Sequence, residues 1–174
     1  MAVGNLEFIK SASGTSVSSL SVTDCFSADY DVYQVNISKV DTTNTTWVSW
    51  SYLDSGGSEI TSAIYDEAVL EMLSYAAYVE SANTGLNNHL RAMRGTANST
   101  DLGGLTITIF NPYNSSSYTF STVQSSGFVS GSGLFGAKGI YVLKQAATHT
   151  GIKVSTQLGT LDNITVKVYG LASN

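Results

Sequence analysis

Apolar and small polar residues alternate one by one along most of this sequence, and no other feature constrains its fold as strongly. Tyr33, Val35 and Ile37, for example, are separated by Gln34 and Asn36. In an extended chain the first three side chains lie on one face and the polar ones on the other, which is typical of a half-buried strand. The runs with strand character are 33–38, 46–53, 59–65, 90–94, 105–110, 118–125, 140–145, 152–156 and 164–171.

These runs predict a mainly β protein. About nine or ten strands joined by short polar connections favour a jelly-roll-like, two-sheet β-sandwich over a parallel α/β fold. Because nearly every strand alternates, we expect antiparallel pairing, with one solvated face on each sheet. A length of 174 residues fits one domain. We therefore predict a single antiparallel β-sandwich domain over residues 1–174.

One segment, 66–81, has a different pattern and predicts a short helical insertion. Four of its apolar residues fall at helical spacing: Val69, Met72, Leu73 and Ala76. Asp66 is suited to cap the start of a helix, and the sequence Asn-Thr-Gly at 83–85 is suited to end it. A loop lying over the sheet is the alternative for this segment.

The composition excludes several classes of protein. Hydrophobic residues make up 43% of the chain and charged residues only 12%, and the mean hydropathy is +0.08, so an ordered domain is expected. A net charge of −5 disfavours binding to nucleic acid. We see no apolar run near the ~20 residues that span a bilayer and no export signal, so we expect no membrane partner and synthesis in a cytoplasm.

Residues for catalysis or for a cofactor are scarce. The histidines are His89 and His149, and the sequence lacks a nucleophile elbow between a strand and a helix. Cys25 is the single cysteine, which excludes an internal disulfide and a site of several thiolates, and it is expected to be a small buried apolar group. We expect neither an enzyme nor a bound cofactor or metal.

Acidic residues form two groups, and each leaves an alternative open. The groups are Asp24, Asp29 and Asp31, and Asp66, Glu67 and Glu71. Neither has the ligand spacing of a helix-flanked calcium loop, although an irregular calcium site made by several loops stays open. A pair of glycosidase acids also stays open, because only their distance in space decides it.

The two tryptophans lie three residues apart in a predicted strand, so their rings are expected on opposite faces. Trp50 shares the face of Val48 and Tyr52 and is expected in the core. Trp47 lies on the other face, where it is the candidate contact for a glycan or for another subunit.

Three phrases of the sequence resemble a known group of proteins. They are 6–11 (LEFIKS), 26–33 (FSADYDVY), which leads into a strand, and 163–171 (NITVKVYGL) at the end of the chain. The order of these phrases resembles small virion structural proteins of tailed bacteriophages, especially marine and cyanobacterial ones. The resemblance implies a β-sandwich on the virion surface: a head decoration or knob protein, a fibre component or a tail-tip domain. It supplies no catalytic residues, and the segment 66–83 has no counterpart in it.

The sequence therefore predicts a structural protein of a phage particle, foremost a capsid decoration or knob protein. Its expected partners are other copies of itself, with a trimer as the first expectation, and the capsid or tail proteins of the phage. The alternative is a tail-fibre or receptor-binding tip that recognises host surface glycans through Trp47 and tyrosines. In either case the expected location is the virion surface, after assembly in the host cytoplasm.

Overall fold

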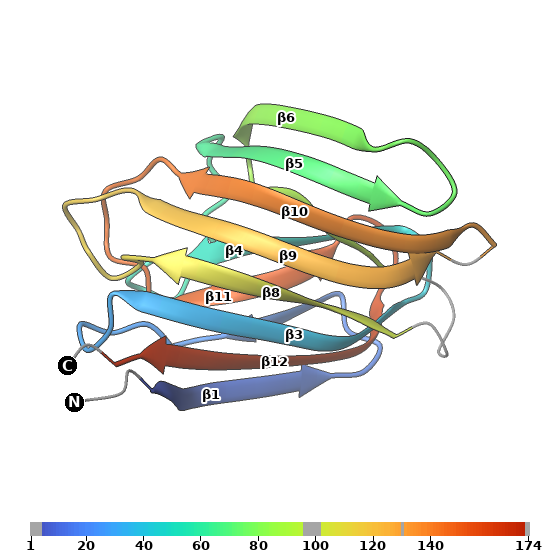
Figure 1. Cartoon of the computed structure of the whole chain (residues 1–174). Helices are drawn as coiled ribbons and strands as arrows, with labels where there is room; N and C mark the ends of the chain where they lie inside the picture. Colours follow the sequence, from blue (N-terminus) through green and yellow to red (C-terminus); the bar gives the residue numbers. More distant parts are fainter. Residues whose placement is uncertain (1–4, 96–101, 130, 173–174) are drawn as a thin grey trace.

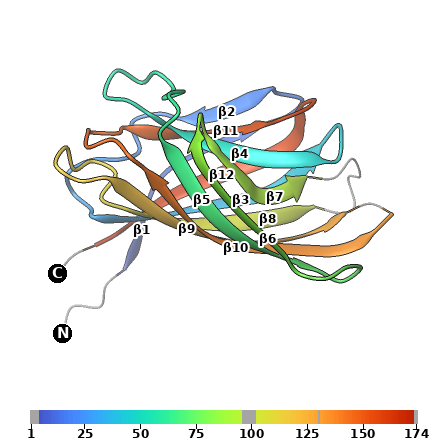
Figure 2. The same cartoon turned by 90° about the horizontal axis from the view of Figure 1, so that it is seen from above.

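The computed structural model describes residues 5–95, 102–129 and 131–172. This part of the chain contains twelve strands and no helix, and all strand pairs are antiparallel. The strands form two sheets that pack face to face as a β-sandwich (Figures 1 and 2). The predicted antiparallel two-sheet fold is thus confirmed. No helix of the described part is available to cross a membrane.

A large sheet and a small sheet make up the sandwich. The large sheet has the order β1-β12-β3-β8-β9-β10-β5-β6. Its strands are β1 (Leu6–Gly14), β12 (Leu161–Leu171), β3 (Val32–Thr42), β8 (Gly103–Phe110), β9 (Thr119–Val129), β10 (Gly133–Leu143), β5 (Tyr65–Leu73) and β6 (Val79–Leu86). The small sheet has the order β2-β11-β4-β7. Its strands are β2 (Ser19–Val22), β11 (Gly151–Thr156), β4 (Thr46–Leu53) and β7 (His89–Gly95).

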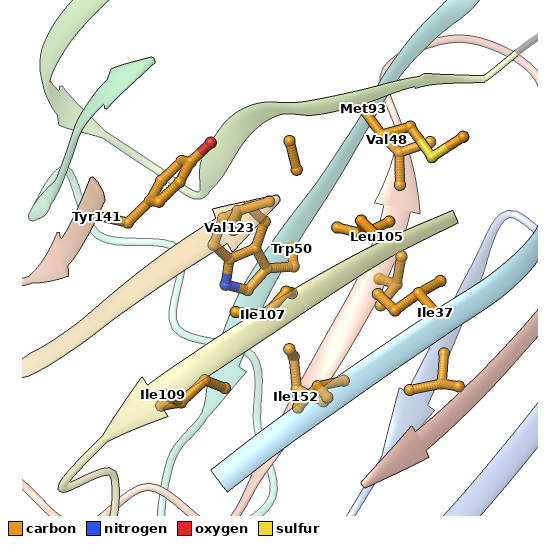
Figure 3. Close-up of a cluster of buried hydrophobic side chains, with 14 of the residues drawn as sticks. Ile37, Val48, Trp50, Met93, Leu105, Ile107, Ile109, Val123, Tyr141 and Ile152 are labelled. Carbon is orange, nitrogen blue, oxygen red and sulfur yellow. The ribbon is translucent and has the colours of Figure 1, made fainter. Parts of the chain in front are cut away.

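The core lies between the sheets and is built from the inward side of the alternation. On β3, Tyr33 and Val35 are completely buried and Ile37 is nearly so, as the pattern predicted. Figure 3 shows Ile37 near Leu105 of β8, and Val48 of β4 belongs to the same buried cluster, so this cluster joins both sheets. Each such side chain contributes about 1.5–3 kcal/mol when it is buried, so this interface supplies the main stabilisation of the fold.

The inward face of β4 confirms the expected position of Trp50. Its side chain is 1% exposed and lies between the sheets with the ring of Tyr141, at a centroid distance of 4.6 Å (Figure 3). Cys25 is also buried, as expected for a small apolar group, and burial raises the pKa of its thiol to about 12.

The predicted helix over 66–81 is wrong. This segment forms β5, a turn and the start of β6, and β5 pairs with β10 on one side and with β6 on the other. The helical spacing of its apolar residues was misleading because both faces of β5 carry apolar side chains: Val69 points inward, whereas Leu70 and Met72 point outward.

A second correction concerns the run 59–65. Only Tyr65 belongs to a strand, as the first residue of β5, while Glu59 makes an isolated bridge to Leu53. The hydroxyl of Tyr65 donates a hydrogen bond to the carbonyl of Ile60 at 2.9 Å, so the preceding residues close over the ring as a loop.

Candidate functional site

The outer face of the large sheet carries the most distinctive surface of the described part. Figure 1 looks onto this face, which is turned away from the small sheet. Six large apolar side chains, each between 38% and 64% exposed, point outward from β5, β9 and β10. We call these residues the apolar patch: Leu70, Met72, Phe120, Phe128, Leu134 and Ile140. Exposed apolar side chains gathered on one face of a protein typically mark an interaction site.

Strand register fixes the order of side chains across the patch. One row runs from Thr122 through Ile140 and Ala68 to Ala82, across β9, β10, β5 and β6. In this row the exposed side chain of Ile140 stands next to Ala68, which pairs in turn with Ala82. The small side chains leave an open groove of about 720 Å³ along β5 and β10.

The next row along the same strands contains two opposite charges. Lys138 of β10 pairs in register with Leu70 of β5, and Leu70 pairs with Glu80 of β6. Both charged side chains line the groove. Among the ion pairs that the described residues form, none includes Lys138 or Glu80. The groove therefore has a cation on one side and an anion on the other, with an apolar side chain between them.

A polar groove adjoins the apolar patch on the same face. It has a volume of about 650 Å³ and lies over β3, β8 and β9. The amide oxygen of Asn36 accepts hydrogen bonds from the amide of Gln34 at 2.9 Å and from the hydroxyl of Thr106 at 3.2 Å. Gln124 and Lys138 line the other side of this groove. The arrangement offers donors and acceptors to a polar ligand such as a sugar.

The second group of predicted acids is divided by the alternation of β5. Asp66 faces outward and forms an ion pair with Lys144 at 2.9 Å, while Glu67 and Glu71 face inward and are 4% and 1% exposed. Glu67 accepts hydrogen bonds from the backbone N–H of Leu90 at 2.7 Å and from the amide of Asn83 at 3.2 Å. Burial raises the pKa of Glu67 to about 7, although these two hydrogen bonds partly oppose the shift.

Glu71 lies between two arginines of β7. Its carboxylate oxygens are each 3.5 Å from a guanidinium nitrogen, one of Arg91 and one of Arg94. Arg91 has a left-handed backbone conformation, with φ of 57°, and it lies where the pairing of β7 with β4 shifts register. The bulge brings both guanidinium groups to the same carboxylate, so Glu71 serves as a structural counter-ion.

Trp47 lies half-buried beside this ion-pair cluster. The guanidinium of Arg94 lies 4.6 Å from the centre of its ring, and Phe135 of β10 makes an edge contact at 5.7 Å. Arginine over an indole is a favourable cation–π arrangement. Contacts within the chain thus occupy part of the indole, and the expected contact of Trp47 with a glycan or a subunit stays a prediction.

Both histidines are completely buried. His89 lies among the rings of Trp50, Tyr65 and Tyr141 at centroid distances of 4.7, 4.8 and 5.1 Å. Burial lowers the pKa of His89 to about 3 and also lowers that of His149. The ring nitrogens of His89 have no hydrogen-bond partner among the described residues. These rings are therefore neutral parts of the interior, out of contact with a substrate in solvent.

The first group of acids lies at the surface. Asp24, Asp29 and Asp31 are all exposed, and the hydroxyl of Ser27 donates a hydrogen bond to Asp29 at 2.9 Å. Within the described ranges, the acidic, histidine and cysteine side chains form no cluster of three that is suited to hold a metal ion. The structure thus separates this group from Glu67 and Glu71.

Comparisons with known proteins give only distant likenesses. No protein-family model and no curated protein matches the sequence. Among solved structures, a double mutant of congerin II is 12% identical with a TM-score of 0.27, over 79% of this chain and 99% of that one. The glucanase SCLam of family GH16, a non-specific endo-β-1,3(4)-glucanase, is 10% identical with a TM-score of 0.28, over 88% and 62%. A subunit of Bacillus endospore appendages, described as disulfide-linked pili, is 14% identical with a TM-score of 0.24, over 99% and 96%. Likenesses this weak say nothing about the activity of this chain.

Sequence reasoning missed the apolar patch and singled out Trp47 instead. The patch depends on the pairing of β5 with β10, and the prediction of a helix over 66–81 removed β5 from the sheet. One signal was present in the sequence. The odd-numbered positions of this segment hold Tyr65, Glu67, Val69 and Glu71, and its even-numbered positions also carry apolar residues. A strand that is apolar on both faces is typical of an interaction surface.

Proposed function

We propose that this chain is a non-enzymatic structural protein on the surface of a tailed bacteriophage particle, most of all a capsid decoration or knob protein. The observation that carries the proposal is the apolar patch on the outer face of the large sheet. A monomer gains nothing by exposing Leu134 and Ile140 at 62% and 64%, whereas a subunit of an assembly buries such side chains against its neighbours.

The sequence resemblance to small virion proteins supports the phage context of this proposal. The proposed subunit is a jelly-roll-like sandwich, because the chain crosses repeatedly from one sheet to the other, as in β10, β11 and β12. It is made in the host cytoplasm and acts at the virion surface. Its proposed partners are other copies of itself and the capsid or tail proteins.

A structural role also agrees with the positions of the titratable side chains. His89 and His149 lie in the interior, and Glu71 is held by two arginines. General acid–base catalysis requires a titratable group within hydrogen-bond reach of a substrate, and these side chains are enclosed by the protein. The proposal therefore includes no substrate, metal or cofactor.

Purified particles provide the test. We expect the protein in mature particles, at a copy number that matches the symmetric positions of the shell when counted by mass spectrometry and electron microscopy. Ile140→Asp, which places a charge in the apolar patch, is expected to reduce incorporation strongly. Thr165→Asp, on the same sheet but on β12, is the matched control and is expected to incorporate normally. Absence from particles, or normal incorporation of Ile140→Asp, would refute the proposal.

The second candidate function is a tail-fibre or receptor-binding tip that recognises host surface glycans. The observation that favours it is the polar groove lined by Asn36, Thr106 and Gln124, whose amide and hydroxyl groups suit a sugar. For this function we expect a low copy number located at the tail, and binding on a glycan array that Gln124→Ala weakens. A protein spread over the whole shell that binds no glycan would exclude this candidate.

A further inference from the structure

We propose that two copies of the chain pair through the outer faces of their large sheets, about a two-fold axis that runs along β5. The contact places Lys138 of each copy opposite Glu80 of the other copy, so the same pair of opposite charges forms twice. This inference rests on the proposed function, because it names the surface through which the structural subunit packs on a second copy. It involves the three strands β6, β5 and β10 (Figure 1).

The charges select the position of the axis. A two-fold axis that lies in the interface along β5 exchanges the two neighbours of β5, so β10 of one copy faces β6 of the other. Since Lys138 and Glu80 flank Leu70 in one row, each lysine then faces a glutamate and the two Leu70 side chains meet at the axis. An axis along β10 would place Lys138 opposite its own copy, which like-charge repulsion disfavours.

The shapes of the side chains agree with the same axis. In the adjacent row, Ile140 and Ala82 flank Ala68 in the same way. The exposed Ile140 of one copy therefore faces Ala82 of the other, and the open groove beside Ala68 provides the space for it. A projecting side chain opposite a small one gives the interdigitation that packed sheets require.

The local charge favours a second copy as the occupant. Two chains with a net charge of −5 repel each other at long range. The groove, however, is lined by one cation and one anion, Lys138 and Glu80, so the facing surfaces are neutral and complementary. Two copies place both charges in ion pairs, whereas an apolar partner of different sequence would leave them buried without a partner.

The size of the surface sets the expected affinity. Three strands about 4.8 Å apart and about eight residues long present roughly 400 Å² of flat area, and side-chain relief increases the accessible area. Two such faces together bury roughly 800 Å² plus the contribution of this relief, so the interface lies at or below the low end of specific interfaces, which is about 1,200 Å² in total. We expect a dimer with a dissociation constant of roughly micromolar order, which many neighbouring contacts on a particle would reinforce.

Charge reversal of the isolated full-length protein tests the pairing. Wild type is expected to sediment as a monomer–dimer equilibrium. Lys138→Glu and Glu80→Lys each create two like-charge contacts and are expected to raise the dissociation constant roughly tenfold or more. The double variant restores both opposite-charge contacts and is expected to dimerise like wild type. Circular dichroism confirms that each variant remains folded.

A cross-link tests the position of the axis. Two Leu70→Cys side chains are expected to lie across a gap of about 10 Å, so a short bis-maleimide reagent is expected to join them into covalent dimers. Thr106→Cys, on the same face but on β8, is the control: it is expected to dimerise like wild type and to give no covalent dimer with this reagent. The native Cys25 is 2% exposed and does not interfere.

Three outcomes would overturn the inference: a wild type that is monomeric at all accessible concentrations, a trimer, or a double variant that fails to recover dimerisation. A protein that is found on particles but gives one of these results would retain the proposed function and lose only the two-fold contact. A purified protein that dimerises as expected but is absent from particles would retain the two-fold contact and lose the proposed function. The two proposals therefore fail separately.

Discussion

The carboxylate of Glu71 lies 3.5 Å from a guanidinium nitrogen of Arg94, although the Glu71 side chain is only 1% exposed. The arginine side chain is 33% exposed, so one partner of this ion pair is enclosed and the other reaches solvent. A buried carboxylate is tolerated when cations and hydrogen bonds compensate its lost hydration. Arg91 and Arg94 provide this compensation from the edge strand of the small sheet, and the pair thus joins the two sheets.

Removal of the Glu71 charge is expected to destabilise the fold. Glu71→Gln keeps the shape of the side chain but leaves two guanidinium groups without their counter-ion, so we expect a loss of about 1–3 kcal/mol. Urea unfolding followed by circular dichroism measures the change. Glu80→Gln, an exposed glutamate on β6, is the matched control and is expected to have little effect in dilute solution. Equal stabilities of the two variants would contradict the assigned role of Glu71.

The raised pKa of Glu67 predicts that the stability of the fold decreases as the pH rises through neutrality. Burial raises its pKa from the ordinary 4.5 to about 7, so between these values the folded state binds more protons than the unfolded state. The contribution is complete below pH 4.5 and is lost as the pH rises through about 7. Glu67→Gln is expected to remove this decrease, which is on the order of 1–3 kcal/mol. The denaturant midpoints of wild type and Glu67→Gln are compared from pH 4.5 to 8. Midpoints that fall equally in the two proteins would contradict this role of Glu67.

The lowered pKa of His89 predicts the opposite pH dependence of stability in the acidic range. Burial lowers its pKa from 6.5 to about 3, so the unfolded state binds more protons in this range and stability falls as the pH decreases from 6.5 towards 3. His89→Phe keeps an aromatic ring and cannot take up the proton. Its stability is expected to change less steeply with pH, by up to about 1.4 kcal/mol per pH unit. An unchanged slope would show that His89 does not govern acid unfolding.

The last strand is expected to be indispensable. Ile164, Val166 and Val168 are at most 2% exposed, and β12 holds β1 to β3 within the large sheet. Truncation before Asn163 removes side chains worth roughly 5–9 kcal/mol together, out of a total stability of about 5–15 kcal/mol. We expect aggregated or unfolded protein, whereas Lys167→Gln on the outer face is expected to melt like wild type. A cooperative melt of the truncated chain near the wild-type temperature would contradict this.

The sequence predicted the strands whose pattern is local. Tyr33, Val35 and Ile37 on β3, and Ile164, Val166 and Val168 on β12, have the expected inward positions because a strand buried on one face needs only its own alternation to be recognised. The position of Trp50 in the core follows from the same rule.

The prediction failed where long-range partners decide the structure. β5 buries Glu67 and Glu71 on the face where a strand normally has apolar residues, and this is stable only because Leu90, Arg91 and Arg94 reach them from β7. Nothing in the sequence near 66–73 reveals these partners, so helical spacing was the stronger local pattern. The apolar patch was missed for the same reason, since its rows exist only when β5 lies beside β10.

The pairing of β1 with β12 would allow the strands to be connected in a different order along the chain. Leu6 and Leu171 are register partners at the edge of the large sheet opposite to β6, so a short linker between them would close the backbone into a ring (Figure 1). New ends opened in the exposed turn at Gly56 and Gly57 would leave both sheets intact. A circular permutant of this kind would move its ends, and any reporter attached to them, to a different side of the sandwich while β5, β6 and β10 keep their registers.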